Sequence, residues 1–305
     1  MTPTETTPNG RTTNFQIPER EHMHPGHLAC PGCGASLAMR LALKALGERT
    51  MVVVPACCWS IIAGPYPTSA VDVPLFHTAF ETAAATASGL RASLAMQGRD
   101  DVTVMAWAGD GGTFDIGLQA LSGAAERNED ILYVCYDNEA YMNTGIQRSG
   151  ATPEGAWTTT TPQGGLKTRP KKDIVRILAA HGVPYVATAN VAYPDDLVEK
   201  FQRAQGINGT KFIHLFSPCP PGWKIDAEAS IDVARLAVDT KVFPLYEMTH
   251  GEHVTINVEP KGLPVGAYFR AQGRFRDLGE EALEQIQAEV EARWDRLTRD
   301  AGRPD

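Results

Sequence analysis

Blocks of apolar residues along the chain change between the pattern of buried strands and that of amphipathic helices. Short β-branched runs, typical of strands covered on both faces, occur at 51–54, 102–108, 131–136, 185–188 and 212–216. Between them, apolar residues recur every three or four positions at 35–46, 114–128, 173–181, 194–204 and 231–240. Strands that alternate with helices predict a doubly wound α/β domain with a mostly parallel sheet.

Segments outside this alternation divide the chain further. Residues 1–21 are rich in threonine and proline and lack periodicity, which predicts a flexible arm before an α/β domain of residues 22–240. Residues 241–305 are predicted to form a C-terminal extension with two extended runs and a last charged helix at 280–299. Residues 73–96 predict a loop followed by a helix rich in alanine, serine and glycine.

Two of the predicted strands end in polar residues that suit a cation and a phosphate. The strand at 102–108 runs into Gly109-Asp110-Gly111-Gly112, and the strand at 131–136 runs into Asp137-Asn138. The carboxyl ends of parallel strands share one edge of a sheet, where open α/β folds bind ligands. Because Mg²⁺ prefers oxygen ligands, we expect it to bind the Asp110 carboxylate, the Asn138 amide oxygen and the carbonyl of Ala140. The three glycines would let phosphates approach the backbone.

The spacing and the residues that follow resemble a known family. Asn138 lies 28 residues after Asp110, and this pair resembles the thiamine diphosphate motif, GDG followed by Asn. The continuation DNEAYMNTG, at 137–145, resembles the β subunit of the pyruvate:ferredoxin oxidoreductase (pyruvate synthase) family, also called the 2-oxoacid:ferredoxin oxidoreductases. QRSGATP at 147–153 and TTTTP at 158–162 resemble the same family. The resemblance implies an α/β fold of the thiamine diphosphate-binding type.

The resemblance also implies further contacts with thiamine diphosphate. Asn143 and Thr144 would face the reactive end or the diphosphate of the cofactor, and we expect Asn143 to be the catalytic polar contact. In the family, a loop equivalent to the one around His77 approaches the cofactor, although a packed or surface histidine is an equal alternative here. Cys58 is expected to lie at the same site.

Six cysteines suggest a second cofactor. They are Cys30, Cys33, Cys57, Cys58, Cys135 and Cys219. The CxxC at 30–33 is compatible with zinc, a redox dithiol or an iron–sulfur cluster. The family's cluster-bearing β subunits have a third cysteine about 25 residues on and a fourth near the end of the sheet. The resemblance therefore implies a 4Fe–4S cluster on Cys30, Cys33, Cys58 and Cys219, with a structural zinc as the alternative. Cys57 and Cys135 are interpreted as buried apolar thiols.

Composition narrows the setting in which this chemistry would occur. Hydrophobic residues make up 43% of the chain and charged residues 21%, as in ordinary globular proteins. The net charge of −8 argues against nucleic acid as a partner. No apolar run approaches the ~18 residues of a membrane span, and the N-terminal residues lack the apolar segment of a secretory signal. We expect a cytoplasmic protein that binds neither nucleic acid nor membranes.

The family resemblance implies a reaction and a set of partners. The reaction is the oxidative decarboxylation of a 2-oxoacid, with pyruvate as the first choice, coenzyme A as co-substrate and ferredoxin as electron acceptor. The glutamate that activates the aminopyrimidine ring has no counterpart that we can assign in this chain, and in the family it lies on another catalytic subunit or domain. We therefore expect a catalytic α subunit, γ and δ subunits with further clusters, and no activity for the chain alone.

Other hypotheses stay open. The same chemistry could act on phenylglyoxylate, a branched-chain 2-oxoacid or oxalate. A non-redox thiamine diphosphate decarboxylase or synthase subunit would explain Asp110 and Asn138 but leaves the spaced cysteines without a role, and its preparations would lack iron and acid-labile sulfide. A non-catalytic electron-transfer subunit would keep the cluster but would not bind thiamine diphosphate with Mg²⁺.

Overall fold

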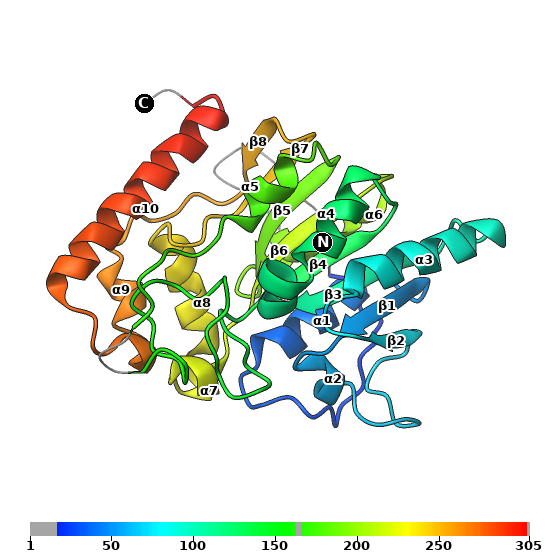
Figure 1. Cartoon of the computed structure of the whole chain (residues 1–305), viewed down its shortest axis with the longest axis horizontal. Coiled ribbons are helices and arrows are strands. Elements are labelled where there is room, and N and C mark those ends of the chain that lie inside the picture. Colours follow the sequence, from blue (N-terminus) through cyan, green and yellow to red (C-terminus); the bar gives the residue numbers. More distant parts are fainter. Residues whose placement is uncertain (1–16, 163–165, 304–305) are drawn as a thin grey trace, which may run out of the picture.

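A single eight-stranded sheet lies at the centre of the computed structural model, which describes residues 17–162 and 166–303 (Figure 1). The strands are β1 (Thr50–Pro55), β2 (Leu75–Thr78), β3 (Thr103–Gly109), β4 (Leu132–Asp137), β5 (Tyr185–Asn190), β6 (Lys211–Phe216), β7 (Tyr246–Thr249) and β8 (His253–Ile256). Their order in the sheet is β2-β1-β3-β4-β6-β5-β7-β8. The first six are parallel to one another, whereas β7 and β8 add an antiparallel edge.

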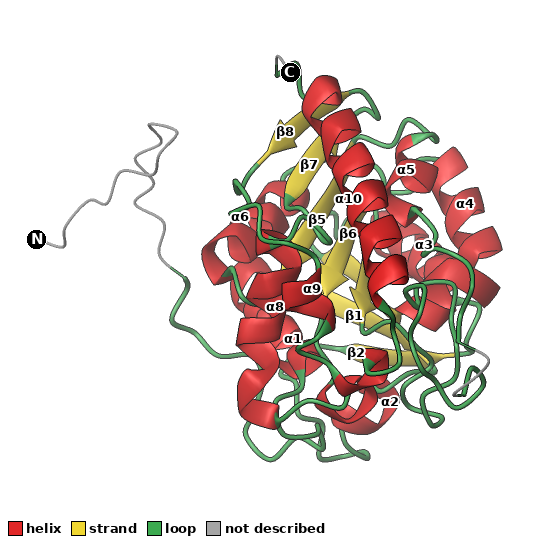
Figure 2. Cartoon of the chain, turned by 90° about the vertical axis from the view of Figure 1, so that its left-hand side faces the viewer, coloured by secondary structure: helices red, strands yellow, loops and turns green. Residues whose placement is uncertain are grey.

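Helices cover both faces of this sheet (Figure 2). The longer ones are α1 (Gly34–Leu46), α3 (Ala83–Met96), α4 (Leu118–Glu126), α6 (Pro194–Gln205), α8 (Ser230–Asp239) and α10 (Glu280–Asp300). The shorter ones are α2 (Trp59–Ile62), α5 (Ile174–Ala179), α7 (Pro220–Trp223) and α9 (Gly266–Phe269). A π-helical turn covers Gly112–Ile116, and 3-10 turns cover Ala227–Ala229 and Gly273–Phe275.

The two faces of the sheet bury separate apolar layers because successive strand side chains point to opposite sides. On one face, Trp107 and Val134 pack with α1 and α6. On the other, Ala106 and Tyr133 pack with α3, α4 and α5. The outward face of α6 is polar, and Asp195 and Asp196 in its first turn interact favourably with the helix dipole.

A third apolar cluster joins the C-terminal extension to the end of β6. Phe216 and Trp223 lie at its centre, with Tyr268 and Phe275 from the extension packed around them. Along α10, Leu283, Val290, Trp294 and Leu297 are buried and Ile286 is half-buried, as the spacing of that helix predicts. The extension therefore reaches back to the carboxyl end of the sheet, where β4 and β6 also end.

The strand order changes direction beside β1, and this change creates the site for a ligand. The chain passes from β1 to β2 on one side and then returns through α3 to β3 on the other. Loops that leave the carboxyl ends of β1 and β3 thus diverge, which opens a crevice of the kind that binds ligands in doubly wound sheets. Gly109 pairs with Tyr136 in the register of β3 and β4, so Asp110 and Asn138 emerge at neighbouring points of the same edge.

The predicted fold class is confirmed, with two local errors. The segment read as a loop before α3 contains β2, a four-residue edge strand whose Phe76 and His77 are exposed and which therefore shows no strand-like apolar run. The helix predicted at 114–128 begins as a π turn and becomes α-helical only at Leu118. The cause is Gly117, whose N–H donates to the carbonyl of Gly112 at 2.9 Å and where a Cβ would overlap that oxygen.

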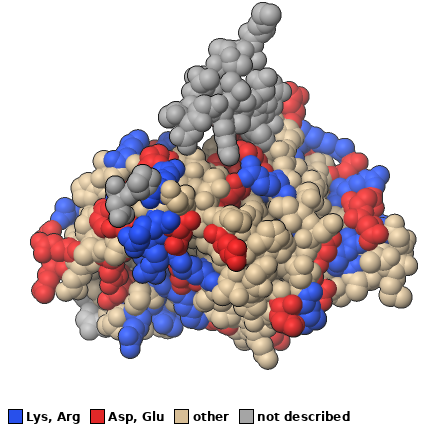
Figure 3. Space-filling model, turned by 90° about the horizontal axis from the view of Figure 1, so that it is seen from above, with Lys and Arg blue, Asp and Glu red and all other residues tan. Residues whose placement is uncertain are grey.

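The surface agrees with the acidic but mixed charge of the sequence. Lys and Arg side chains lie beside Asp and Glu side chains across much of the face in Figure 3. Arg176 and Asp300, for example, join α5 to the end of α10 at 2.6 Å. Within the described ranges, no helix combines the length and the apolar character needed to cross a membrane. Most of the arm predicted at 1–21 lies outside the described residues.

Candidate cofactor site

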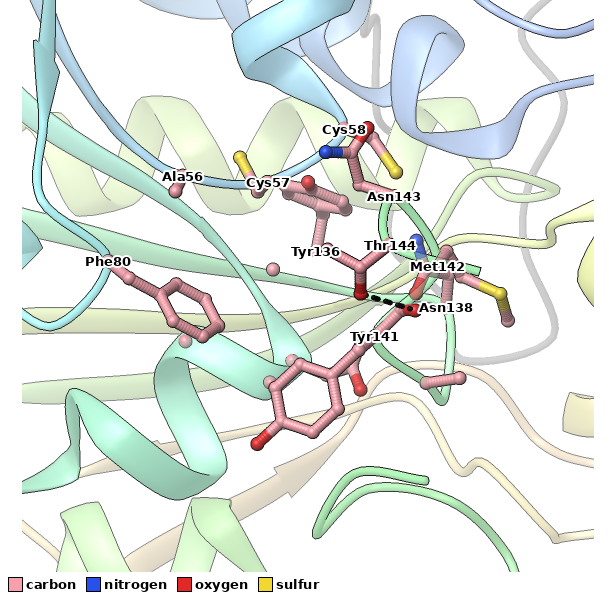
Figure 4. A pocket seen from close by; sticks show the side chains of 15 residues that line it. Ala56, Cys57, Cys58, Phe80, Tyr136, Asn138, Tyr141, Met142, Asn143 and Thr144 are labelled. Carbon is pink, nitrogen blue, oxygen red and sulfur yellow. Dashed lines mark hydrogen bonds between the residues drawn. The ribbon is translucent and has the colours of Figure 1, made fainter. Parts of the chain in front are cut away.

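One pocket lies at the carboxyl edge of the sheet, where the chain changes direction (Figure 4). Its walls come from the loops after β1 (56–58), β3 (109–112) and β4 (138–144), together with Phe80 and Tyr136. Figure 4 shows Cys57 and Cys58 entering from the first of these loops, and Asn143 and Thr144 from the third. Sequence segments that are more than eighty residues apart therefore meet in one place, as the two polar strand ends predict.

Three oxygen-bearing groups meet on the floor of this pocket. Asp110, Asn138 and Ala140 are all buried. The side-chain amide of Asn138 lies 2.9 Å from Asp110 Oδ1 and 3.0 Å from the carbonyl oxygen of Ala140, and in the orientation that satisfies hydrogen bonding its nitrogen donates to both. When the amide turns over, its oxygen faces these two oxygens, and a cation between the three would take the place of the hydrogens. A carboxylate, an amide oxygen and a carbonyl form the donor set of a hard divalent cation.

The surroundings of Asp110 favour cation binding over a free carboxylate. Ser149 Oγ donates to Asp110 Oδ2 at 2.5 Å, which leaves Oδ1 directed at Asn138. Burial, and next the negative charge of Asp137, raise the pKa of Asp110 well above its ordinary value. A buried carboxylate with this surplus of negative charge is stabilised either by a proton or by a cation. The site therefore has the electrostatics expected of a metal site.

Buried ion pairs lie directly behind the three oxygens. Lys171 contacts both Asp137 and Glu139, with its Nζ 2.9 Å from Glu139 Oε1. His214 Nε2 lies 2.7 Å from Asp137 Oδ2. Burial opposes ionisation of Asp137, but Lys171 and His214 lower the pKa of that carboxyl to about 2. Arg274, from the C-terminal extension, pairs with the other oxygen of Glu139.

The walls of the pocket are mostly apolar or aromatic. Tyr136 is buried and stacks on Trp107, with ring centroids 5.8 Å apart. Phe80 and Tyr141 meet edge to face at 6.0 Å, and the Tyr141 hydroxyl donates to Asp115 at 2.7 Å. Cys57 lines the pocket beside Tyr136 and packs against the apolar core, and its interpretation as a buried apolar thiol stays a prediction. A planar cofactor ring would meet flat apolar surfaces here.

Other predicted contacts divide into two groups. Asn143 and Thr144 line the pocket and are exposed, and Thr144 Oγ1 donates to Gln147 at 2.5 Å. His77 is exposed on the edge strand β2 and is not among the residues that line the pocket. Phe80, three residues further on, does line it. The loop after β2 thus reaches the pocket through a different residue.

The four predicted cluster cysteines lie near the pocket and near one another. Cys33, Cys58 and Cys219 stand at the N-caps of α1, α2 and α7. Burial, then the neighbouring thiols, raise the pKa of Cys58, and burial raises the pKa of Cys219 to about 12. Cys30 acts electrostatically on both Cys33 and Cys219. Across the described residues, however, no three His, Cys, Asp or Glu side chains converge as metal ligands, so cluster binding remains a prediction.

Sequence reasoning missed several residues that shape the site. They are Ser149, which reaches Asp110, Lys171 and Arg274, which reach the Glu139 carboxylate, and Trp223, which reaches the Asn138 carbonyl. Ser149 had a signal, since it lies in the stretch QRSGATP that resembles the family. Arg274 had none, because only the folded chain brings residue 274 beside residue 139.

Gly111 offers a direct test of the pocket. A Cβ at this position would overlap the Tyr141 ring, whose hydroxyl is tied to Asp115. We expect Gly111→Ala to displace the ring and to weaken thiamine diphosphate binding about 100-fold, because small misplacements in such sites have large effects. Isothermal titration calorimetry of the wild type and the variant with thiamine diphosphate and Mg²⁺ measures the change in dissociation constant.

Gly89→Ala on α3 is the matched control for this substitution. No atom lies within 4 Å of the Cβ position of Gly89, and the residue is exposed within a helix. Alanine there should stabilise the helix by up to about 1 kcal/mol and leave binding unchanged. Equal binding by the two variants would mean that the pocket tolerates a methyl group at residue 111.

Comparison with known proteins places these features in context. The model of the thiamine pyrophosphate enzyme C-terminal TPP-binding domain matches residues 57–215, which include the three oxygens and most of the pocket. The chain is 52% identical to ketoisovalerate oxidoreductase subunit VorB of Pyrococcus furiosus over 294 residues, covering 92% of this chain and 94% of that protein. It is 51% identical to pyruvate synthase subunit PorB of Methanothermobacter thermautotrophicus over 281 residues, covering 91% and 98%.

A solved structure supports the fold. The 2-oxoglutarate:ferredoxin oxidoreductase of Magnetococcus marinus, determined with 2-oxoglutarate, coenzyme A and succinyl-CoA, superposes with a TM-score of 0.58. The match covers 73% of this chain and 81% of that chain at 24% sequence identity. At this level of identity the likeness concerns the arrangement of strands and helices.

Proposed function

This chain is a β-type subunit of the 2-oxoacid:ferredoxin oxidoreductase family, and we propose that it binds thiamine diphosphate with Mg²⁺ for the oxidative decarboxylation of a 2-oxoacid. The observation that carries the proposal is the meeting of the Asp110 carboxylate, the Asn138 side-chain amide and the Ala140 carbonyl at the carboxyl ends of β3 and β4. The subunit names of the relatives support a multi-subunit complex around this chain.

The residues present suit the proposed cofactor. Asp110, Asn138 and Ala140 would hold the cation, and Gly111 and Gly112 would admit the phosphates without a side chain in the way. Thiamine diphosphate, when bound, supplies the reactive carbon at which a 2-oxoacid loses carbon dioxide. Phe80, Tyr136 and Tyr141 would exclude water from that carbon, and Asn143 would orient the substrate by a polar contact.

An iron–sulfur cluster is proposed as the first electron acceptor. Conversion of a 2-oxoacid and coenzyme A to an acyl-coenzyme A and carbon dioxide releases two electrons and a proton, and a cluster accepts one electron at a time. Cys30, Cys33, Cys58 and Cys219 are free and lie close enough to interact, which supports their use as the four ligands of one cluster. Ferredoxin is the proposed final acceptor. Reduced thiols of this kind agree with a cytoplasmic location.

A partner subunit is required by the same proposal. No carboxylate of the described pocket wall other than Asp110 is available, so the group that activates the aminopyrimidine ring would come from another chain. We propose a catalytic α subunit in this role, with smaller subunits carrying further clusters. The isolated chain should then bind the cofactor weakly and show no turnover.

The proposal also names the 2-oxoacid that the complex uses. Pyruvate remains the first candidate. The branched acid ketoisovalerate is the second, because the chain is almost equally identical to a pyruvate synthase subunit and to a ketoisovalerate oxidoreductase subunit.

The test is a coenzyme A-dependent reduction of a viologen dye by the native complex, prepared without oxygen, with a panel of 2-oxoacids. We expect two dye molecules to be reduced for each pyruvate consumed. Reduction only with ketoisovalerate would keep the reaction and change the substrate. No reduction with any acid, in a preparation shown to retain thiamine diphosphate, would favour a non-redox decarboxylase or synthase instead.

A further inference from the structure

The backbone around Asn138 is held by hydrogen bonds from three donors elsewhere in the chain. The carbonyl of Asp137 accepts from the Ser217 N–H at 2.9 Å, and the carbonyl of Asn138 accepts from Trp223 Nε1 at 2.8 Å. The carbonyl of Glu139 accepts from Thr152 Oγ1 at 2.7 Å. Each carbonyl from 137 to 139 thus has a partner on the side away from the pocket. The carbonyl of Ala140 is the first that faces Asn138 and Asp110.

Glu139 is the residue that turns the chain at this point. Its φ is +68°, a conformation that residues with a Cβ rarely adopt and that persists only where the surroundings impose it. Its carboxylate is buried and receives Lys171 on Oε1 and Arg274 on Oε2. Two cations therefore clamp the one side chain whose backbone directs Asn138 and Ala140 toward Asp110.

Arg274 is connected to the Asn138 carbonyl as well as to Glu139. Its guanidinium carbon lies 4.3 Å from the centre of the Trp223 ring, the ring that donates to Asn138. Gln272 accepts from Arg274 Nε at 2.9 Å and fixes the orientation of the guanidinium plane. Arg274 is buried, and it lies outside residues 57–215, the part of the chain that the family model matches.

We propose that Arg274 is a positioning residue that sets the affinity of the Asp110–Asn138–Ala140 site for its divalent cation. It holds Glu139 directly and the Asn138 carbonyl through Trp223, so that the two oxygens of the turn face Asp110. The C-terminal extension is then part of the cofactor site although none of its residues lines the pocket. This inference rests on the proposed function, since it assumes that the site takes a cation with a diphosphate.

The experiment measures Mn²⁺ binding to the complete complex, cleared of cations and supplied with thiamine diphosphate, by the paramagnetic resonance signal of free Mn²⁺. Arg274→Met is expected to raise the Mn²⁺ dissociation constant about 10- to 100-fold, the usual effect of losing a group that supports a metal ligand. Arg274→Lys keeps the charge but loses the planar stacking on Trp223, so it should recover part of the affinity. Arg270→Met, which breaks an exposed pair with Glu280, should bind as the wild type does.

A second variant keeps the proposal testable if Arg274→Met fails to fold. Trp223→Phe preserves an aromatic ring but removes the donor to the Asn138 carbonyl, and we expect a roughly tenfold higher dissociation constant. A role in stability alone would reduce the number of Mn²⁺ sites and leave their dissociation constant unchanged, and that result would overturn the proposal. Wild-type affinity in both variants would do the same. Absence of a Mn²⁺ site in the wild-type complex would instead refute the proposed function itself.

Discussion

Replacing Asp110 with asparagine is expected to weaken Mg²⁺-dependent binding of thiamine diphosphate by more than about 100-fold while the chain stays folded. Asparagine keeps an oxygen for the Ser149 hydroxyl, so the local hydrogen bond survives. It removes the only negative charge among the three converging oxygens, and with it the main attraction for a divalent cation. Turnover of the complex should fall by at least the same factor.

The pH dependence of binding gives this prediction a second measurement. Burial and the charge of Asp137 raise the pKa of Asp110, so the cation-free chain holds a proton there at pH values where an ordinary aspartate is ionised. Mg²⁺ must displace that proton, and the affinity of the wild type should therefore rise with pH until the carboxyl is ionised. The Asp110→Asn variant should bind weakly at every pH.

The free energy of unfolding of the cation-free chain should fall as the pH rises, opposite to the affinity for Mg²⁺. Because the pKa of Asp110 is higher in the folded state than in the unfolded state, the folded chain binds more protons at this carboxyl. The free energy of unfolding therefore falls as the pH rises through the raised pKa. Asparagine carries no such charge and should remove this loss, which thermal unfolding at pH 5 and pH 8 would reveal. Asp101→Asn, at the opposite end of β3 in an exposed pair with Arg49, is the control and should alter neither binding nor its pH dependence. Wild-type affinity of Asp110→Asn for Mg²⁺ would exclude this carboxylate as a ligand.

The part of the molecule that could be predicted from sequence is the part with local patterns. The strands that carry Asp110 and Asn138 are buried on both faces, so their apolar runs are continuous and end sharply at polar residues. The edge strand β2 is not buried on either face, so its four residues form no continuous apolar run and the sequence predicts a loop there. The π turn that begins at Gly112 likewise depends on the close approach of Gly117 to the Gly112 carbonyl, which the spacing of apolar residues does not indicate.

The supporting residues of the site escaped prediction for a different reason. Lys171 and Arg274 act on Glu139 from segments 32 and 135 residues away along the chain. A lone lysine or arginine in a sequence reads as a surface charge, and only burial beside a carboxylate gives it another role.

The cysteines provide the other large expected effect, because adjacent residues should behave in opposite ways. Both thiols line the pocket, and Cys58 interacts electrostatically with Cys57, Cys219 and Cys33, whereas Cys57 lies beside Tyr136. Burial raises the pKa of Cys33 and Cys219, and backbone N–H groups at Ala35 and Ser36 beside Cys33 and at Gly222 beside Cys219 offset part of this effect. Cys33, Cys58 and Cys219 thus come from three segments that lie close enough to interact beside the pocket.

Cys58→Ser is therefore expected to remove the iron and acid-labile sulfide bound by this chain and to abolish viologen reduction, since a 4Fe–4S cluster needs four thiolates. Cys57→Ser should retain the full iron content, and Cys135→Ala, in the buried core of β4, should do so as well. Iron and sulfide analysis of the chain produced and purified without oxygen separates these outcomes. Iron lost equally from Cys57→Ser and Cys58→Ser would mean that the loop after β1, rather than one ligand, supports the cluster. Zinc in place of iron in the wild type would instead identify the four thiolates as a structural zinc site. The reaction would then need a different electron acceptor.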